Sequence, residues 1–68
     1  MRRLNLKLFR IRHDLTQYQM AERIGYERAA YSMVEAGTRN PSIEFFMNLQ
    51  EAFDVPDEKM WELTRLED

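Results

Sequence analysis

The side chains of this 68-residue chain are poorly suited to covalent or metal chemistry. The chain has no cysteine, a single histidine (His13) and no glycine-rich phosphate loop, and its carboxylates are scattered. A chain of this length also has little room for a ligand pocket of roughly 300–1,000 Å³. We therefore expect no catalytic residues, no metal site and no cofactor. The chain does contain basic, amide and hydroxyl side chains, which can bind anions and form hydrogen bonds with a polar partner.

Positive charge is concentrated at the start of the chain and negative charge at its end. Residues 1–13 contain five basic and no acidic side chains, whereas residues 54–68 contain six acidic and two basic ones. The net charge of −2 argues against an indiscriminate nucleic-acid binder. The asymmetry suggests one basic end that faces phosphate and one acidic end turned away from it. The alternative is that both ends are simply solvated.

Residues 16–35 predict two short helices joined by a tight turn. Each half carries an apolar stripe at the spacing i, i+1, i+4, made of Met20, Ala21 and Ile24 in the first half and Ala30, Tyr31 and Val34 in the second. Thr16 followed by Gln19 is a capping box, so the first helix should span about 17–24. Gly25 can take the positive φ that ends a helix, and the joint 25–27 fits a turn between helices crossing at roughly 90–120°. These features are a helix-turn-helix signature, with the second helix over 27 or 28 to 36.

Three more helices are expected around this pair. The first spans about 4–13, with Leu6, Phe9 and His13 as candidates for its buried face. Gly37 ends the second helix of the helix-turn-helix pair, and Pro41 prevents that helix from continuing. Ser42 then caps a helix over about 43–53. A last helix should span about 56–66, with Pro56 in its first turn.

Within the last two helices, several positions lead to definite expectations. Phe46, Leu49 and Phe53 repeat at i, i+3, i+7 and are predicted to lie in the core. Gln50 either makes a satisfied polar contact or lies at a subunit interface. The final helix carries more apolar surface than so short an element needs, so we expect Met60, Trp61 and Leu63 to form a dimer interface. Trp61 closing the core on Phe53 is the alternative.

The outer face of the second helix of the pair is the candidate binding surface. Once its apolar stripe turns inward, Arg28, Ala29, Ser32 and Met33 remain outside. In a helix-turn-helix module this face lies in the major groove of DNA. The guanidinium of Arg28 can bond bidentately to O6 and N7 of guanine, and Ser32 can bond a base or a phosphate. Ala29 and Met33 can offer only apolar contact, for example with a thymine methyl group.

The ordered set Leu15-Thr16-Gln17, Ala21-Glu22, Ile24-Gly25, Glu35-x-Gly37 and Asn40-Pro41-Ser42 resembles the phage-repressor and Cro family of helix-turn-helix domains. The resemblance continues to Val55 and Met60-Trp61, and so covers nearly the whole chain. The sequence departs from the family pattern at Asp14 and Asp54, where glycine is usual, at Glu27, where serine or threonine is usual, and at Gln50, where alanine is usual.

The resemblance also implies roles for individual residues. Gln17 corresponds to a glutamine that bonds a DNA phosphate, and Arg10 corresponds to an arginine that pairs with the residue equivalent to Glu35. We expect this ion pair to be structural and largely buried. The phosphate contacts should be completed by the turn after the second helix, with Thr38, Arg39 and Asn40. Arg2, Arg3 or Arg12 should join them if the N-terminal segment lies on the DNA side.

These observations predict one all-α, five-helix domain over residues 1–68, with the helix-turn-helix at its second and third helices. The expected function is that of a cytoplasmic, repressor-like transcriptional regulator that binds double-stranded DNA as a homodimer, with no membrane and no small-molecule ligand involved. The alternative is the same fold used as a protein-interaction module, such as an antitoxin, an antirepressor or an adaptor. The acidic balance, Glu27 at the tip of the reading helix, and the apolar Ala29 and Met33 favour that alternative.

Overall fold

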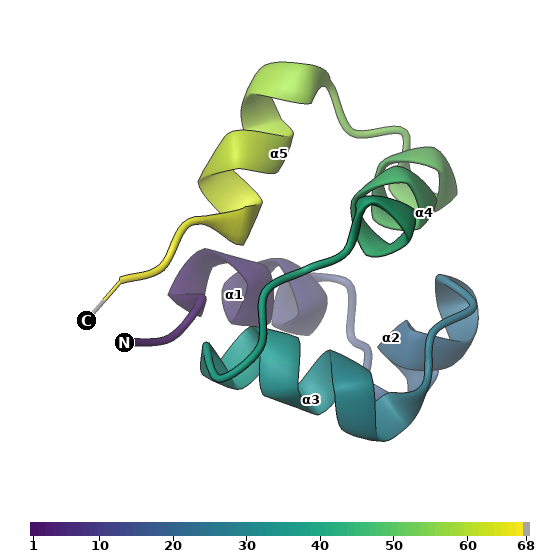
Figure 1. Cartoon of the computed structure of the whole chain (residues 1–68). Helices are drawn as coiled ribbons and strands as arrows, with labels where there is room; N and C mark the ends of the chain where they lie inside the picture. Colours follow the sequence, from purple (N-terminus) through teal and green to yellow (C-terminus); the bar gives the residue numbers. More distant parts are fainter. Residues whose placement is uncertain (68) are drawn as a thin grey trace.

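The computed structural model describes residues 1–67, so Asp68, which belongs to the acidic C-terminal end, lies outside it. The described residues form five helices: α1 (Leu4–Arg12), α2 (Gln17–Arg23), α3 (Arg28–Ala36), α4 (Ile43–Phe53) and α5 (Asp57–Thr64). The expected all-α, five-helix architecture is confirmed for this part of the chain. Figure 1 shows α3 along the base of the molecule and α5 above α1, with the two chain ends close together. There, Arg2 and Glu67 exchange two backbone hydrogen bonds of 2.8 and 2.6 Å.

The helix-turn-helix segment has the ends that its sequence predicts. The hydroxyl of Thr16 accepts a hydrogen bond from the backbone N–H of Gln19, whose side chain accepts one from the Thr16 N–H. Gly25 has φ of +66° and ends α2, although the last helical residue is Arg23 rather than the expected Ile24. Ser42 caps α4 with its hydroxyl, which accepts a hydrogen bond from the Phe45 N–H. Local capping chemistry thus determines where these helices begin.

Two aspartates occupy the left-handed conformations for which glycine is the usual residue. Asp14, after α1, has φ of +56°, and Asp54, after α4, has φ of +52°. A left-handed L-residue costs roughly 1–2 kcal/mol, and aspartate is among the few residues that adopt this conformation with any regularity. Aspartate therefore adopts, at both positions, a conformation that glycine takes more readily.

The fully buried phenylalanine of α4 is Phe45, and not Phe46 or Phe53 as predicted. Phe45 and Leu49 are fully buried, whereas Phe46 and Phe53 are only half-buried and pack against the edge of the core. The prediction that Phe46 and Phe53 lie in the core was therefore wrong in degree. Residues 45–47 are all large and apolar, so periodicity alone could not decide which of them faces inward.

Helix α5 contributes two of its three large apolar side chains to this core. Met60 and Leu63 are buried, while Trp61 is 72% exposed. Met60 and Leu63 therefore cannot belong to a surface between two copies of this fold, and this part of the expected dimer interface was wrong. The alternative for Trp61 was also wrong, because its ring lies edge-on to Phe46, at 6.1 Å between centroids, and not on Phe53.

The remaining expectations for the C-terminal half are met with small corrections. The side-chain amide of Gln50 donates to a carboxylate oxygen of Asp57, so it makes a polar contact within the chain. Pro56 precedes α5 instead of lying in its first turn, and α5 ends at Thr64 instead of Leu66. Across residues 1–67, no helix has the length and apolar character needed to span a bilayer.

Candidate nucleic-acid interface

The outer face of α3 is open to solvent, as the sequence predicted. Arg28, Ala29 and Met33 are exposed and Ser32 is half-buried, while Tyr31 on the opposite face is completely buried against the core. The helix is thus anchored by one side and presents the other. Within residues 1–67, no other element covers this face, which includes all four residues expected to contact bases.

Arg28, the one cationic side chain on this face, lies near an aromatic ring of the preceding helix. Its guanidinium carbon is 6.0 Å from the centroid of the exposed Tyr18 ring. That distance is at the outer limit of a cation–π contact, worth about 0.5–1 kcal/mol at an exposed site. This contact favours conformations of the Arg28 side chain in which the guanidinium lies on the side of the face next to α2. Glu27, just before α3, is exposed and makes no side-chain capping bond.

The carboxylate of Glu35, near the C-terminal end of α3, accepts four hydrogen bonds. Its two oxygens accept from Arg10 Nε at 2.9 Å, Arg10 Nη2 at 3.1 Å, the Tyr31 hydroxyl at 2.8 Å and Gln17 Nε2 at 3.1 Å. The Arg10 and Glu35 side chains are only 12% and 6% exposed. The expected structural ion pair is therefore present, it is bidentate, and it joins α1 to α3.

The ionisation of this cluster follows from its contacts. Burial by itself raises the pKa of Glu35. The hydrogen bonds from Arg10, Tyr31 and Gln17 lower this pKa by more than burial raises it, so the net pKa lies below the ordinary value. Burial, together with the hydrogen bond to Glu35, raises the pKa of Tyr31 and keeps it protonated. The pKa of Arg10 is raised by its bond to Glu35. The cluster thus holds one negative and one positive charge at neutral pH.

Gln17 joins this cluster to the surface. It is half-buried at the start of α2, and its bond to the Glu35 carboxylate requires that the amide nitrogen, not the oxygen, points inward. One N–H of the same nitrogen remains available to an acceptor outside. Glu35 therefore orients Gln17 as a donor, which is the orientation that a phosphate contact needs.

The turn after α3 carries the other three residues proposed to contact phosphate. Thr38, Arg39 and Asn40 are exposed. The backbone N–H and the hydroxyl of Thr38 both donate to the Met33 carbonyl, at 3.0 and 3.3 Å. The turn is therefore tied to the C-terminal end of the α3 outer face.

Arg3 has a structural role that the sequence did not reveal. It is 3% exposed, and its guanidinium donates to the carbonyl oxygens of Thr64, Val34 and Arg39 at 2.8, 2.8 and 3.1 Å and to Asn40 Oδ1 at 3.4 Å. Its charge lies where α3 and α5 both end, and helix C-termini favour cations. Arg3 is thus withdrawn from phosphate contact, unlike the exposed Arg2 and Arg12. No local pattern signals this role, because the acceptors are 31 to 61 residues away.

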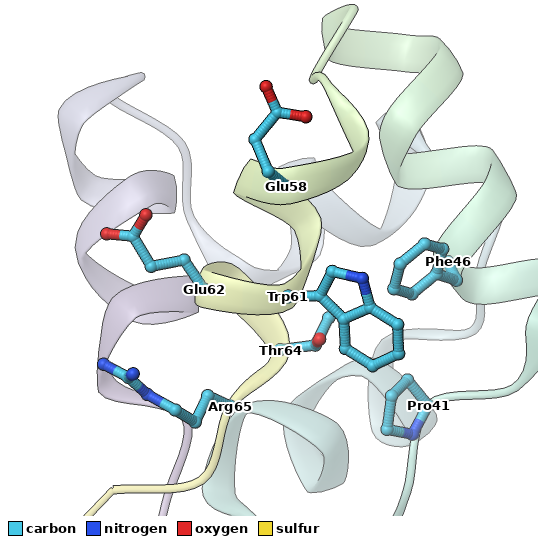
Figure 2. A pocket seen from close by; sticks show the side chains of 7 residues that line it. All are labelled: Pro41, Phe46, Glu58, Trp61, Glu62, Thr64 and Arg65. Atoms are coloured by element: carbon cyan, nitrogen blue, oxygen red, sulfur yellow. The ribbon is translucent and has the colours of Figure 1, made fainter.

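The groove around Trp61 lies between α5, α4 and the turn before α4. It has a volume of about 670 Å³ and is shown in Figure 2, where Trp61 points toward Phe46 and Pro41. Glu58 and Glu62 extend from α5, and Arg65 follows the end of this helix. On neighbouring α4, Ile43 and Met47 are 79% and 60% exposed. Of the three side chains expected at a subunit contact, only Trp61 is on the surface.

Comparison with known proteins finds helix-turn-helix regulators. A family model described as helix-turn-helix matches residues 6–60. An uncharacterized HTH-type transcriptional regulator of Bacillus subtilis (strain 168), YqaE, is 39% identical over 51 residues, which are 75% of this chain and 44% of that protein. This chain thus aligns with less than half of the Bacillus protein.

Two uncharacterized HTH-type transcriptional regulators of Archaeoglobus fulgidus are similar in length to the chain. They are 29% identical over 68 residues and 27% identical over 67 residues, covering 88% and 87% of this chain and 96% of each relative. No solved structure matches the chain significantly.

Proposed function

This chain belongs to the phage-repressor and Cro-like family of helix-turn-helix regulators, and on that premise we propose that it is a repressor-like protein that inserts α3 into the major groove of DNA. Membership of this family indicates a DNA-binding regulatory role without catalysis. The proposal adds the groove, the residues that read it, and the mode of regulation, which is occupancy of a DNA site.

The observation that carries the proposal is the two-sided character of α3. Its inner side is buried, whereas Arg28, Ala29, Ser32 and Met33 are accessible along its outer side. An α-helix with its side chains is about 10–12 Å across, and the major groove is about 12 Å wide and 8.5 Å deep. The outer face of α3 therefore fits the groove without rearrangement of the core.

Each accessible side chain has a distinct role in this arrangement. Arg28 donates two hydrogen bonds to O6 and N7 of one guanine, and Ser32 bonds a neighbouring base edge or phosphate. Ala29 and Met33 exclude water and contact a thymine methyl group. Such a sparse set of readers gives modest direct discrimination, about 1–3 kcal/mol for each good bidentate contact.

The phosphate contacts flank the reading helix on two sides. Gln17 donates its free N–H at one side, and Thr38, Arg39 and Asn40 approach the backbone at the other. Such contacts fix the register of the protein on the duplex and carry no sequence information of their own. Buried side chains hold these phosphate-contacting residues in place. Glu35 orients Gln17, and Arg3 donates hydrogen bonds to the Arg39 carbonyl and the Asn40 side chain.

We further propose that the protein binds DNA as a homodimer through the groove around Trp61. The molecule measures 26 × 26 × 23 Å, and symmetric half-sites are read about 34–36 Å apart, so one copy reads only one half-site. In a two-fold pairing of antiparallel α5 helices, Trp61 lies near the axis. Glu58 of each copy then faces Arg65 of the other, since Glu58 lies in the first turn of α5 and Arg65 directly follows the last residue of this helix.

The same apolar surface supports the second candidate function, a protein-interaction module. Trp61 on α5 and Ile43 and Met47 on α4 are exposed apolar side chains that a protein other than a second copy would also bury. Glu27, beside the tip of the reading helix, would repel phosphate. In this candidate, α3 contributes little to binding and the α4–α5 surface contributes most.

Selection of bound duplexes from a random pool, followed by titration at two salt concentrations, tests the proposal. A DNA-binding regulator should enrich one sequence, two-fold symmetric if it dimerises. Its log affinity should fall with log salt at a slope of about −0.9 per phosphate contacted. Failure to enrich any sequence, together with no binding to random duplex at low salt, would favour the protein-interaction module.

A further inference from the structure

A second hollow lies beside the reading helix, between α3, the start of α2 and the N-terminal segment. It has a volume of about 230 Å³ and is lined by Arg2, Arg3, Lys7, Gln17, Ser32, Glu35 and Ala36. Ser32 and Ala36 are one turn apart on α3, so the hollow borders the outer face of that helix along its C-terminal half. The N-terminal segment is therefore next to the proposed reading surface.

The position of the N-terminal segment is fixed by backbone contacts. The N–H of Arg2 donates to the Glu67 carbonyl at 2.8 Å, and the N–H of Arg3 donates to the Glu35 carbonyl at 3.0 Å. A Cβ atom placed on Gly37 would lie 2.3 Å from the Met1 carbonyl oxygen, so the segment packs directly on the end of α3. Arg2 thus extends from a fixed backbone and not from a free arm.

The chemistry of the hollow suits an anion. Three cationic side chains border it, and its one carboxylate, Glu35, is already neutralised by the bidentate bond to Arg10. Gln17 presents its second amide N–H from one wall and Ser32 a hydroxyl from another. Arg3 is committed to carbonyl oxygens, which leaves Arg2 and Lys7 as the cations available to a ligand.

We propose that this hollow binds one phosphate of the DNA backbone, held by Lys7 and Arg2 through charge and by Gln17 and Ser32 through hydrogen bonds. The inference rests on the proposed function and extends its phosphate contacts from the α3–α4 turn to α1 and the N-terminal segment. It assigns a use to the basic start of an otherwise acidic chain. It also makes Ser32 a phosphate ligand and leaves base reading to Arg28, Ala29 and Met33.

The test compares Lys7→Gln and Arg2→Gln with wild type and with the control Lys59→Gln, which removes an exposed charge from α5. Each of the first two variants should weaken binding to selected and random duplexes by the same factor. The slope of log affinity against log salt should become shallower by about 0.9 for each phosphate that a variant no longer neutralises. Lys59→Gln should leave the slope unchanged, and Lys7→Arg should restore it. Thermal unfolding of all four variants should match the wild type.

Three other results would overturn the inference. Wild-type binding with unchanged slopes in Lys7→Gln and Arg2→Gln would remove the phosphate site while leaving the proposed function intact. Absence of any wild-type DNA binding would remove both. In the third, inorganic phosphate shifts the amide resonances of Gln17 and Ser32 while the DNA slopes of the variants stay unchanged, which would show a site for free phosphate only.

Discussion

Replacing Glu35 with glutamine should destabilise the fold far more than its single charge suggests. Glu35→Gln keeps the size of the side chain but leaves the Arg10 guanidinium without an anion at a site where the two side chains are 12% and 6% exposed. Removing one partner of a buried pair typically costs about 3–5 kcal/mol, because the other charge stays buried. The Tyr31 hydroxyl and Gln17 lose a charged acceptor at the same time.

This loss is large for a chain of 68 residues. At roughly 0.05–0.15 kcal/mol per residue, the whole fold is worth about 3–10 kcal/mol. With a Tm shift of about 4–8 °C per kcal/mol in domains of this size, Glu35→Gln should lower the Tm by roughly 12–40 °C. Thermal and urea unfolding followed by circular dichroism measure both quantities. The matched control is Glu51→Gln, which removes an exposed carboxylate from α4 and should change the Tm little.

The pH dependence gives an independent check of the same pair. The folded-state pKa of Glu35 is depressed below its ordinary value of 4.5. The stabilisation from Glu35 is therefore complete above pH 4.5 and is lost as the pH falls through the lower folded-state pKa. The stability difference between wild type and Glu35→Gln should be constant near neutral pH and should shrink once the pH falls below the ordinary pKa. If Glu35→Gln unfolds like Glu51→Gln at neutral pH, the ion pair does not stabilise the fold and the reasoning is wrong.

Four further variants, the first two of them compared with each other, test other parts of the structure. Gly37→Ala should cost more than about 2 kcal/mol in urea unfolding, because φ is +85° and the new Cβ would collide with the Met1 carbonyl. Gly25→Ala should cost only about 1–2 kcal/mol, because φ is +66° but the new Cβ would meet no other atom. Equal losses of stability in the two variants would contradict the packing of the N-terminal segment on α3. Arg3→Met should cost at least about 2 kcal/mol, since buried carbonyl oxygens lose a charged donor; a wild-type Tm would contradict its role at the ends of α3 and α5. Trp61→Glu should leave the Tm of the monomer unchanged and weaken dimerisation by at least about 2 kcal/mol in sedimentation equilibrium, whereas a wild type that stays monomeric at high micromolar concentration would end the dimer proposal.

The sequence predicted best where structure depends on near neighbours. The Thr16 capping box, the Ser42 cap and the positive φ of Gly25 are decided within a few residues, so the starts of α2 and α4 and the end of α2 were predictable to within one residue. The Arg10–Glu35 pair spans 25 residues and came from the family resemblance, not from local chemistry.

The sequence predicted worst where one face had to be chosen among several apolar residues. The side chains at 45–47 of α4 and at 60–63 of α5 allow more than one inward face, and only the packing of the other helices determines which is buried. The structure selects Phe45 over Phe46 and leaves Trp61 outside. Arg3 could not be predicted, because a charge held by backbone carbonyl oxygens of distant helix ends leaves no complementary acid in the sequence.

The most direct test of the central claim, that Arg28 reads guanine in the major groove, is a substitution in the DNA. In the selected duplex, 7-deazaguanine replaces each guanine in turn, which deletes the N7 acceptor and leaves base pairing intact. At one position per half-site the wild type should bind about 2–13-fold more weakly, because one of the two hydrogen bonds of a bidentate contact worth about 1–3 kcal/mol is lost. Arg28→Ala should bind both duplexes equally. A loss of the same size in Arg28→Ala, or no loss at any guanine for the wild type, would contradict the account.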